Sequence, residues 1–282
     1  MNEASLLARV PASRRGLVLG IGDDAAIYRP KADEDLTFTT DLFIENVHFR
    51  ARGPGAISAE QAGYRAMARS LSDAAAMGAR PRFCLVSLSL APWTTVRWFD
   101  GFYRGLLGLA DRYGCTLAGG DLSHTPQVVC DVMVCGSVPK GKALRRDGAR
   151  VGDVLYVSGS LGGWRHRPMP VPRLDVARKI LGRATAAMDV SDGLALDLHR
   201  MCLASGVAAR LDVTPPVLRG ATLEEALHAG EDYELLYTAP KGVRMPGHRL
   251  GTIEKGPPGR ITLLGKPLSP HGYDHFESRA RS

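Results

Sequence analysis

The chain has 282 residues, 45% of them hydrophobic and 23% charged, which excludes a disordered protein and favours two domains over one. Its formal net charge is +7. The close basic pairs Arg14-Arg15 and Arg145-Arg146 lack the interleaved aromatic residues that stack bases. A small anionic substrate explains the charge equally well, and we expect no nucleic-acid partner.

Cysteines and apolar runs indicate the compartment. The five cysteines are scattered and lack the close paired spacing of a zinc site, so we expect buried, reduced thiols. Near the N-terminus, Leu6, Leu7 and Val10 are too few for the apolar part of a signal peptide, and no later apolar run is long enough to span a bilayer. These patterns predict a cytoplasmic protein without a membrane partner.

Hydrophobic periodicity predicts alternating helices and strands in the first half of the chain. The first helix carries small and apolar residues at helical spacing and stops at Gly78. The predicted elements are a helix over 58–77, a strand over 83–90, an amphipathic helix over 94–113 and a strand over 128–134.

A polar, basic and glycine-bearing stretch at 136–152 predicts a domain boundary. We expect an α/β domain over 1–138 and an α+β domain over 150–282. The second half is predicted to contain a strand at 154–158, a glycine turn at 159–163, a helix after Pro172, a turn at 189–193, helices over 193–204 and 222–229, and strands near 207–213, 234–238, 249–253 and 261–264.

Seven aspartates in five segments stand beside glycine or small polar residues. Carboxylates that converge in a cleft repel one another, so they either stay protonated or recruit cations. Because Mg²⁺ is usually held by one or two carboxylates with waters and phosphates, this set indicates several ions and a polyphosphate ligand. The seven are Asp23, Asp24, Asp41, Asp73, Asp121, Asp189 and Asp192.

Each segment also has an ordinary structural explanation. The glycines before Asp23 and Asp24 match a dinucleotide-binding loop, but these carboxylates would repel phosphate without a metal, and a tight turn is the alternative. Asp73 lies either at the solvent edge of its helix or beside cations. Residues 119–121 are typical of a turn, and Asp192 of a helix N-cap. Only the ordered co-occurrence of all five segments favours a metal site.

A series of motifs runs in order along nearly the whole chain. They are Gly20-Ile-Gly-Asp-Asp-Ala-Ala26, Thr39-Thr-Asp-Leu-Phe-Ile-Glu-Asn-Val-His-Phe49, Leu71-Ser-Asp-Ala-Ala-Ala-Met-Gly-Ala79, Gly119-Gly-Asp121, Asp189-Val-Ser-Asp-Gly-Leu194, Gly230-Glu-Asp-Tyr-Glu-Leu235 and Gly272-Tyr-Asp-His-Phe276. Together they resemble the motifs of the thiamine-monophosphate kinase family. The resemblance implies the aminoimidazole ribonucleotide synthetase-like fold, in which the N-terminal domain binds ATP and metals and forms a homodimer, and the C-terminal domain closes the cleft.

The resemblance also implies roles for individual residues. Metal ligands would be Asp23, Asp24, Thr39, Thr40, Asp41, Asp73, Asp121, Asp189 and Asp192. ATP contacts would be Tyr103, Gly120, Asp121, Arg146 and Ser191, and contacts to thiamine monophosphate would be His48, Glu231 and Tyr273. Asp41, Asp121 and Arg146 would be catalytic.

The implied reaction is transfer of the γ-phosphoryl group of ATP, in line, to the phosphate of thiamine monophosphate. That acceptor has a second pKa of about 6, so it needs no general base, and charge neutralisation by Mg²⁺ and Arg146 is the main task. Without the resemblance, His48 would be a buried structural histidine, Tyr103 core packing, Glu231 with Asp232 a solvated helix end, and Tyr273 a terminal hydrophobic anchor.

One stretch departs from the family pattern. The chain passes almost directly from Leu161-Gly-Gly163 to Arg165-His-Arg-Pro168, where the family usually has one or two further helices. The change spares the aspartates but can reshape the pocket, which leaves turnover and substrate identity open. The alternatives are another ATP-dependent enzyme of the same superfamily and a catalytically impaired, nucleotide-binding regulatory protein. The branches that use a reactive terminal cysteine are disfavoured, since no cysteine lies near either end.

Overall fold

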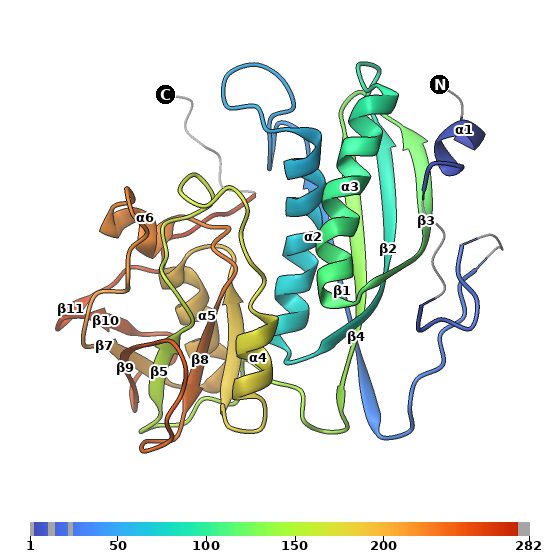
Figure 1. The fold of residues 1–282 in the computed structure, drawn as a ribbon. Coiled ribbons are helices and arrows are strands. Elements are labelled where there is room, and N and C mark those ends of the chain that lie inside the picture. Colours follow the sequence, from blue (N-terminus) through green and yellow to red (C-terminus); the bar gives the residue numbers. More distant parts are fainter. Residues whose placement is uncertain (1–2, 11–14, 22–24, 276–282) are drawn as a thin grey trace. The chain divides into compact units, whose positions relative to one another are not determined.

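A computed structural model describes residues 3–10, 15–21 and 25–275. The chain divides into two compact units (Figure 1). The first unit comprises residues 1–74 and 79–143, and the second comprises residues 75–78 and 144–282. Asp23 and Asp24 lie outside the described residues, as does Phe276.

The first unit is a four-stranded sheet with two long helices on one face (Figure 1). The strand order is β1-β4-β2-β3, with β3 parallel to β2 and the other pairs antiparallel. The elements are α1 (Glu3–Leu7), β1 (Glu34–Ile44), α2 (Ala59–Ala76), β2 (Arg80–Leu90), α3 (Val96–Tyr113), β3 (Thr116–His124) and β4 (Val129–Pro139).

Glycines let α2 and α3 approach each other closely. A Cβ at Gly63 would stand 1.9 Å from the carbonyl oxygen of Phe102, and one at Gly105 would stand 1.9 Å from that of Glu60. The Thr95 side chain caps α3 by accepting a hydrogen bond from the Trp98 backbone N–H at 3.1 Å. The predicted helices at 58–77 and 94–113 are therefore confirmed, with ends shifted by one or two residues.

Two predictions in the first unit were incomplete or wrong. Strand β1 was not predicted, because the polar Thr37, Thr39 and Asp41 occupy the positions that face the helices and so hide the usual apolar alternation. Residues 119–121 are not a turn but part of β3. A Cβ at Gly120 would stand 1.9 Å from the Val86 carbonyl oxygen, so close approach of a neighbouring strand accounts for the glycine.

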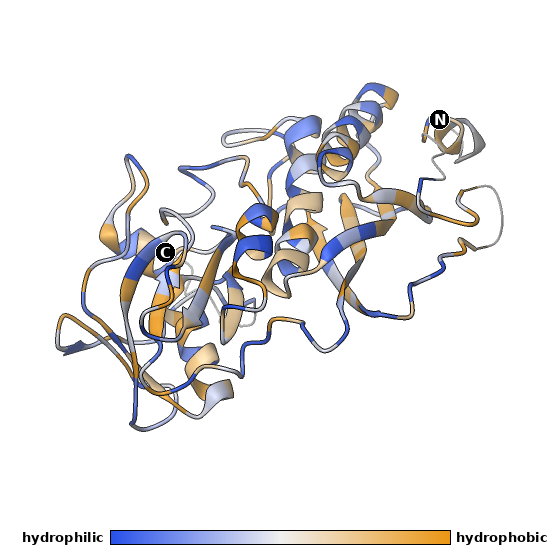
Figure 2. Cartoon of the chain, turned by 60° about the horizontal axis from the view of Figure 1, so that its bottom comes forward, coloured by the Kyte–Doolittle hydropathy of each residue, from blue (hydrophilic) through white to orange (hydrophobic). Residues whose placement is uncertain are grey.

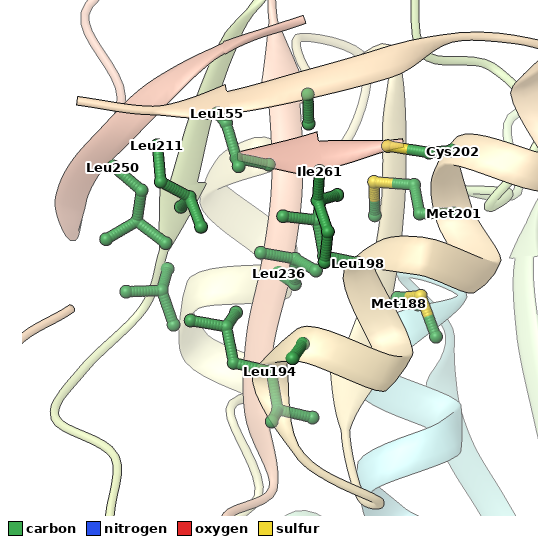
Figure 3. Close-up of a cluster of buried hydrophobic side chains, with 14 of the residues drawn as sticks. Leu155, Met188, Leu194, Leu198, Met201, Cys202, Leu211, Leu236, Leu250 and Ile261 are labelled. Atoms are coloured by element: carbon green, nitrogen blue, oxygen red, sulfur yellow. The ribbon is translucent and has the colours of Figure 1, made fainter. Parts of the chain in front are cut away.

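The second unit is a seven-stranded sheet of order β11-β10-β7-β9-β5-β8-β6. Helix α5 packs against the sheet through a core that includes Leu155, Leu194, Leu198, Leu236 and Ile261 (Figure 3). The elements are β5 (Val154–Val157), α4 (Leu174–Ile180), β6 (Ala186–Val190), α5 (Leu194–Ser205), β7 (Ala208–Leu211), α6 (Leu223–His228), β8 (Glu234–Ala239), β9 (His248–Glu254), β10 (Ile261–Leu263) and β11 (Lys266–Pro267).

The turn at 189–193 is shorter than predicted. Asp189 and Val190 belong to β6, and the turn starts only at Ser191. Asp192 is not the N-cap of α5, since that position is Gly193 and no side chain caps the helix there. The strand was missed because its five residues are all buried, which hides the alternation of a half-exposed strand, and because Asp189 resembles a turn residue.

Between β5 and α4 the chain forms bends and turns and contains no helix. The helices elsewhere carry hydrophilic and hydrophobic residues together (Figure 2). None of the helices in the described part of the chain is long and apolar enough to cross a membrane.

Candidate active site

A first group of predicted ligands meets between β1 and α2. The Thr39 hydroxyl donates a hydrogen bond to Asp73, and the Ser70 hydroxyl donates to Asp41 Oδ2 at 3.0 Å. Arg69 Nε lies 3.9 Å from Asp41 Oδ1. Alternation along β1 directs residues 39 and 41 towards α2, and the helical spacing of 69, 70 and 73 directs these residues back. We call Thr39, Asp41, Arg69, Ser70 and Asp73 the β1–α2 cluster.

Burial makes this cluster receptive to a cation. It raises the pKa of the Asp41 carboxyl, and Arg69 and the Ser70 hydroxyl oppose that rise. Two carboxylates and a threonine hydroxyl offer the hard oxygen donors that Mg²⁺ prefers, in the number it usually takes from a protein. Among the described residues, no group of three or more His, Cys, Asp and Glu side chains is placed to hold a metal ion. Mg²⁺ binding at this cluster therefore stays a prediction.

Other predicted residues of the first unit lie on the opposite face of the sheet. The Thr40 hydroxyl donates to Asp131 Oδ1 at 2.6 Å, and strand register places Asp131, Ser87 and Asp121 in one row. Asp121 is exposed on the edge strand β3. The structure thus separates Thr40 and Asp121 from the β1–α2 cluster. Asp131 was missed, although a lone acidic residue within an apolar strand is a usable signal.

His48 and Tyr103 are packed into the first unit. His48 is 9% exposed, its Nδ1 accepts a hydrogen bond from the Ile44 N–H at 3.0 Å, and its ring stacks on Phe43. Tyr103 is 6% exposed, contacts the Phe99 ring at a centroid distance of 4.8 Å, and has its pKa raised by burial. Their contacts to substrate and ATP stay predictions, because both are also explained by core packing.

In the second unit, the turn after β6 is held by a buried carboxylate. Asp197, fully buried in α5, accepts hydrogen bonds from the backbone N–H groups of Ser191 and Asp192, each at 3.0 Å. Arg200 lies 2.5 Å from Asp192 and 3.0 Å from Asp197. Burial raises the pKa of Asp197 to about 6, against the effect of the two N–H groups and of Arg200, while the charge of the Asp192 carboxylate adds to the rise. Sequence reasoning missed Asp197, which sits at an ordinary helical position.

Two further predicted segments join this turn. The Glu231 backbone N–H donates to the Ser191 carbonyl oxygen at 2.7 Å, and the Tyr273 N–H donates to the Asp192 carbonyl oxygen at 2.9 Å. Residues predicted to contact ATP, metal and thiamine monophosphate thus come together at one edge of the second unit. Asp189 lies on β6 and is 7% exposed. Arg146 is exposed, and its carbonyl oxygen accepts a hydrogen bond from Ser205.

A pocket of about 410 Å³ opens beside this junction. Three stretches of the second unit line it, including the segment that departs from the family pattern. The lining residues are Gly162, Gly163, Trp164, Arg165, Glu225, His228, Ala229, Gly230, Gly272, Tyr273 and Asp274. Tyr273 is thus part of a pocket wall, and its contact to thiamine monophosphate stays a prediction.

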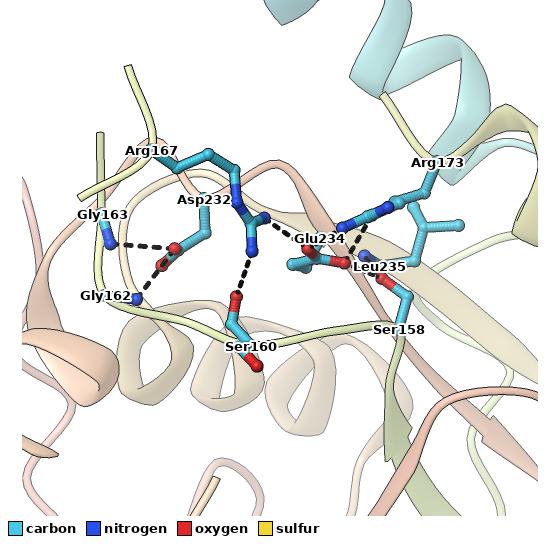
Figure 4. Close-up of polar contacts among 9 residues, drawn as sticks. All are labelled: Ser158, Ser160, Gly162, Gly163, Arg167, Arg173, Asp232, Glu234 and Leu235. Atoms are coloured by element: carbon cyan, nitrogen blue, oxygen red, sulfur yellow. Dashed lines mark hydrogen bonds and ion pairs between the residues drawn. The ribbon is translucent and has the colours of Figure 1, made fainter. Parts of the chain in front are cut away.

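Behind the pocket, a buried acidic pair ties the shortened segment to β8 (Figure 4). Asp232 Oδ1 accepts the backbone N–H groups of Gly162 and Gly163, each at 2.9 Å. Glu234, fully buried, lies 2.5 Å from a guanidinium nitrogen of both Arg167 and Arg173. The alternative of a solvated helix end is therefore wrong for Asp232, which is 2% exposed.

The fold and these sites place the protein among the AIR synthase related proteins. The model of their N-terminal domain matches residues 22–138, and the model of their C-terminal domain matches residues 166–245. A solved structure of the hydrogenase maturation protein HypE with ATP, 17% identical, shares the fold with a TM-score of 0.77. The two-domain fold predicted from the motifs is confirmed.

Within this class, the chain belongs to the thiamine-monophosphate kinase family. The Haemophilus influenzae enzyme of that name is 32% identical over 92% of each chain, and the Escherichia coli K12 enzyme is 34% identical over 97% of this chain and 98% of that one. The Stenotrophomonas maltophilia thiamine-monophosphate kinase structure is 34% identical, with a TM-score of 0.82 over 94% of this chain and 96% of that chain. AaThiL complexed with AMPPCP and TMP is 30% identical, with a TM-score of 0.80 over 91% and 92%.

The comparison with the Escherichia coli enzyme also shows that this chain is shorter overall. Its alignment has 324 positions and takes up 97% of the 282 residues of this chain, so about 50 positions lie opposite gaps in this chain.

Proposed function

We propose that this protein transfers the γ-phosphoryl group of ATP to the phosphate of thiamine monophosphate, giving thiamine diphosphate and ADP. The observation that carries the proposal is the match to thiamine-monophosphate kinases along nearly the whole chain. The AaThiL complex with AMPPCP and TMP supports the two substrates. The converging turn, loop and pocket of the second unit fit such substrates.

The reaction makes electrostatic demands on the protein. At neutral pH the acceptor phosphate is largely ionised and attacks without a general base, so the protein must bring two polyanions together and neutralise them. Mg²⁺, when bound, would supply positive charge at the transferring phosphoryl group. Asp41 and Asp73 would hold it, with the Thr39 hydroxyl beside them, and the exposed guanidinium of Arg146 would contact ATP.

The remaining residues divide between the two substrates and further metal ions. We assign Thr40, Asp121, Asp189, Asp192, Asp23 and Asp24 to metal ions, Tyr103, Gly120, Asp121 and Ser191 to ATP, and His48, Glu231 and Tyr273 to thiamine monophosphate. The support is the order of the motifs, together with the hydrogen bonds from Glu231 and Tyr273 to the turn that carries Ser191 and Asp192. In this assignment residues 1–138 supply most of the metal ligands, and residues 150–282 supply Ser191 for ATP and two further metal ligands, Asp189 and Asp192.

We also propose that the protein forms a homodimer through the open face of its first sheet. Phe38 is 65% exposed and Leu42 is 51% exposed on β1, and exposed apolar side chains on one sheet face mark an interaction surface. Light scattering should show a dimer that Phe38→Asp and Leu42→Asp together convert to a monomer.

A cytoplasmic location is supported by the five cysteines, all free thiols and all buried.

Release of ADP tests the function directly. Purified protein with Mg²⁺ and ATP should release ADP only when thiamine monophosphate is added, and chromatography should show thiamine diphosphate in equal amount. Nucleotide binding without turnover would favour the regulatory alternative. ADP release that does not depend on thiamine monophosphate would indicate another acceptor.

A further inference from the structure

We propose that Trp164, carried by the shortened segment, forms the aromatic wall that recognises the thiamine ring system in this enzyme. The inference rests on the proposed function and deepens it. It starts from the pocket of the second unit, where Trp164 lies in the lining together with Tyr273. Motif comparison did not assign Trp164, because it lies where this chain departs from the family pattern.

The backbone on either side of Trp164 is firmly held. On the N-terminal side, Asp232 accepts the N–H groups of Gly162 and Gly163. On the C-terminal side, His166 Nε2 lies 3.2 Å from Glu225 Oε1, and the Arg167 guanidinium contacts Glu234 and donates to the Ser160 carbonyl oxygen at 3.0 Å. A wall fixed before the ligand arrives loses little conformational entropy on binding.

Glycine brings this segment close to the opposite side of the pocket. Gly163 has φ +80°, in the region that favours glycine, and a Cβ there would stand 3.0 Å from Ala229 Cβ and 3.1 Å from the Gly230 carbonyl oxygen. Ala229 and Gly230 themselves line the pocket. The short segment therefore lies directly on the loop that carries Glu231, and the next side chain, Trp164, is half-buried at the pocket.

The chemistry of the pocket suits a flat ligand that carries both a positive ring and a phosphate. It has two aromatic side chains, Trp164 and Tyr273, and two carboxylates, Glu225 and Asp274, and its lining also includes Arg165 and His228. Hydrogen bonds from the Thr222 backbone N–H and from His166 lower the pKa of Glu225, which keeps it charged. Thiamine carries a cationic thiazolium ring and an aminopyrimidine, and such rings are attracted to the face of a tryptophan.

Substitution of Trp164 tests the inference by separating the two substrates. We expect Trp164→Ala to raise the KM and the Kd for thiamine monophosphate about tenfold, within the range of an aromatic or cation–π contact, and to leave the KM for ATP and the kcat nearly unchanged. Trp164→Phe should restore most of the affinity. Trp93→Ala, at a half-buried tryptophan of the first unit, is the matched control and should change neither the KM nor the Kd for thiamine monophosphate.

Each result decides between the inference and its competitors. An unchanged Kd for thiamine monophosphate in Trp164→Ala would overturn the inference, while normal turnover would leave the proposed function standing. Equal losses for ATP and thiamine monophosphate, with a lower melting temperature, would show a purely structural role and would also overturn it. Unsubstituted protein that neither binds nor phosphorylates thiamine monophosphate would overturn the proposed function, and the inference with it.

Discussion

Two groups of acidic side chains, one half-buried and one fully buried, are neutralised in different ways. In the β1–α2 cluster, Asp41 has a serine hydroxyl at 3.0 Å and an arginine at 3.9 Å. In the second unit, Glu234 is contacted by Arg167, Arg173 and the Ser158 hydroxyl, a set that we call the Glu234 cluster. A buried carboxylate with two contacting guanidinium groups has its charge balanced within the fold. A half-buried carboxylate with a hydroxyl and a more distant guanidinium is suited to an added cation. On this ground we propose a structural role for the Glu234 cluster and a metal-binding role for the β1–α2 cluster.

The largest expected effect comes from the β1–α2 cluster. Asp41→Asn should keep the fold and lower kcat by about a hundredfold or more, because the charge that holds Mg²⁺ near the phosphoryl group is lost. Steady-state ADP release over a range of Mg²⁺ concentrations measures this. Asp212→Asn is the control, since Asp212 forms ion pairs with Arg210 and Arg249. Undiminished turnover in Asp41→Asn would remove this cluster from the metal site.

Substitution in the Glu234 cluster should mainly lower the stability of the fold. Glu234→Ala leaves two arginines without their carboxylate partner and should lower the free energy of unfolding by about 3–5 kcal/mol. Denaturant unfolding measures it. Glu254→Ala is the control, because Glu254 is 36% exposed in its pair with Arg210 and should cost at most about 1 kcal/mol. If both substitutions lower the free energy of unfolding by the same amount, the Glu234 cluster would have no special structural role.

The most gradual effect is a pH dependence from Asp232, which is spread over several pH units. Burial raises the pKa of this carboxyl to about 7, although the N–H groups of Gly163 and Gly162 lower it. In the unfolded chain the pKa is about 3.9, so between about pH 4 and pH 7 the folded state holds a proton that the unfolded state has lost. Stability from this group therefore falls as pH rises through that window, by at most about 1.4 kcal/mol per pH unit.

Asp232→Asn removes this titration while its side-chain oxygen can still accept both N–H groups. Denaturant midpoints measured from pH 4 to pH 8 should show the variant gaining on the unsubstituted protein until about pH 7 and running parallel above it. A constant difference across the whole range would mean that Asp232 does not titrate in the folded state.

Local sequence signals were enough for elements whose apolar residues follow one clear period. Helices α2, α3 and α5 were predicted to within two residues, because their small and apolar residues follow helical spacing and a glycine stands just beyond each. Strand β1 and the strand positions of Asp121 and Asp189 were missed. Polar residues face the helices in β1, and a glycine or aspartate that resembles a turn residue is held in a strand by its neighbours.

By itself, the sequence determined the family, through the order of its aspartate motifs, and with it the expected reaction. Only the tertiary structure decided which of those residues meet. Strand alternation sends Thr39 and Thr40 to opposite faces, and strand pairing brings Asp131 into the row of Asp121. Asp232 is buried and holds the backbone of Gly162 and Gly163, and Trp164 lies in a pocket wall. Register and burial depend on contacts between residues far apart in the chain, so a motif read locally does not contain them.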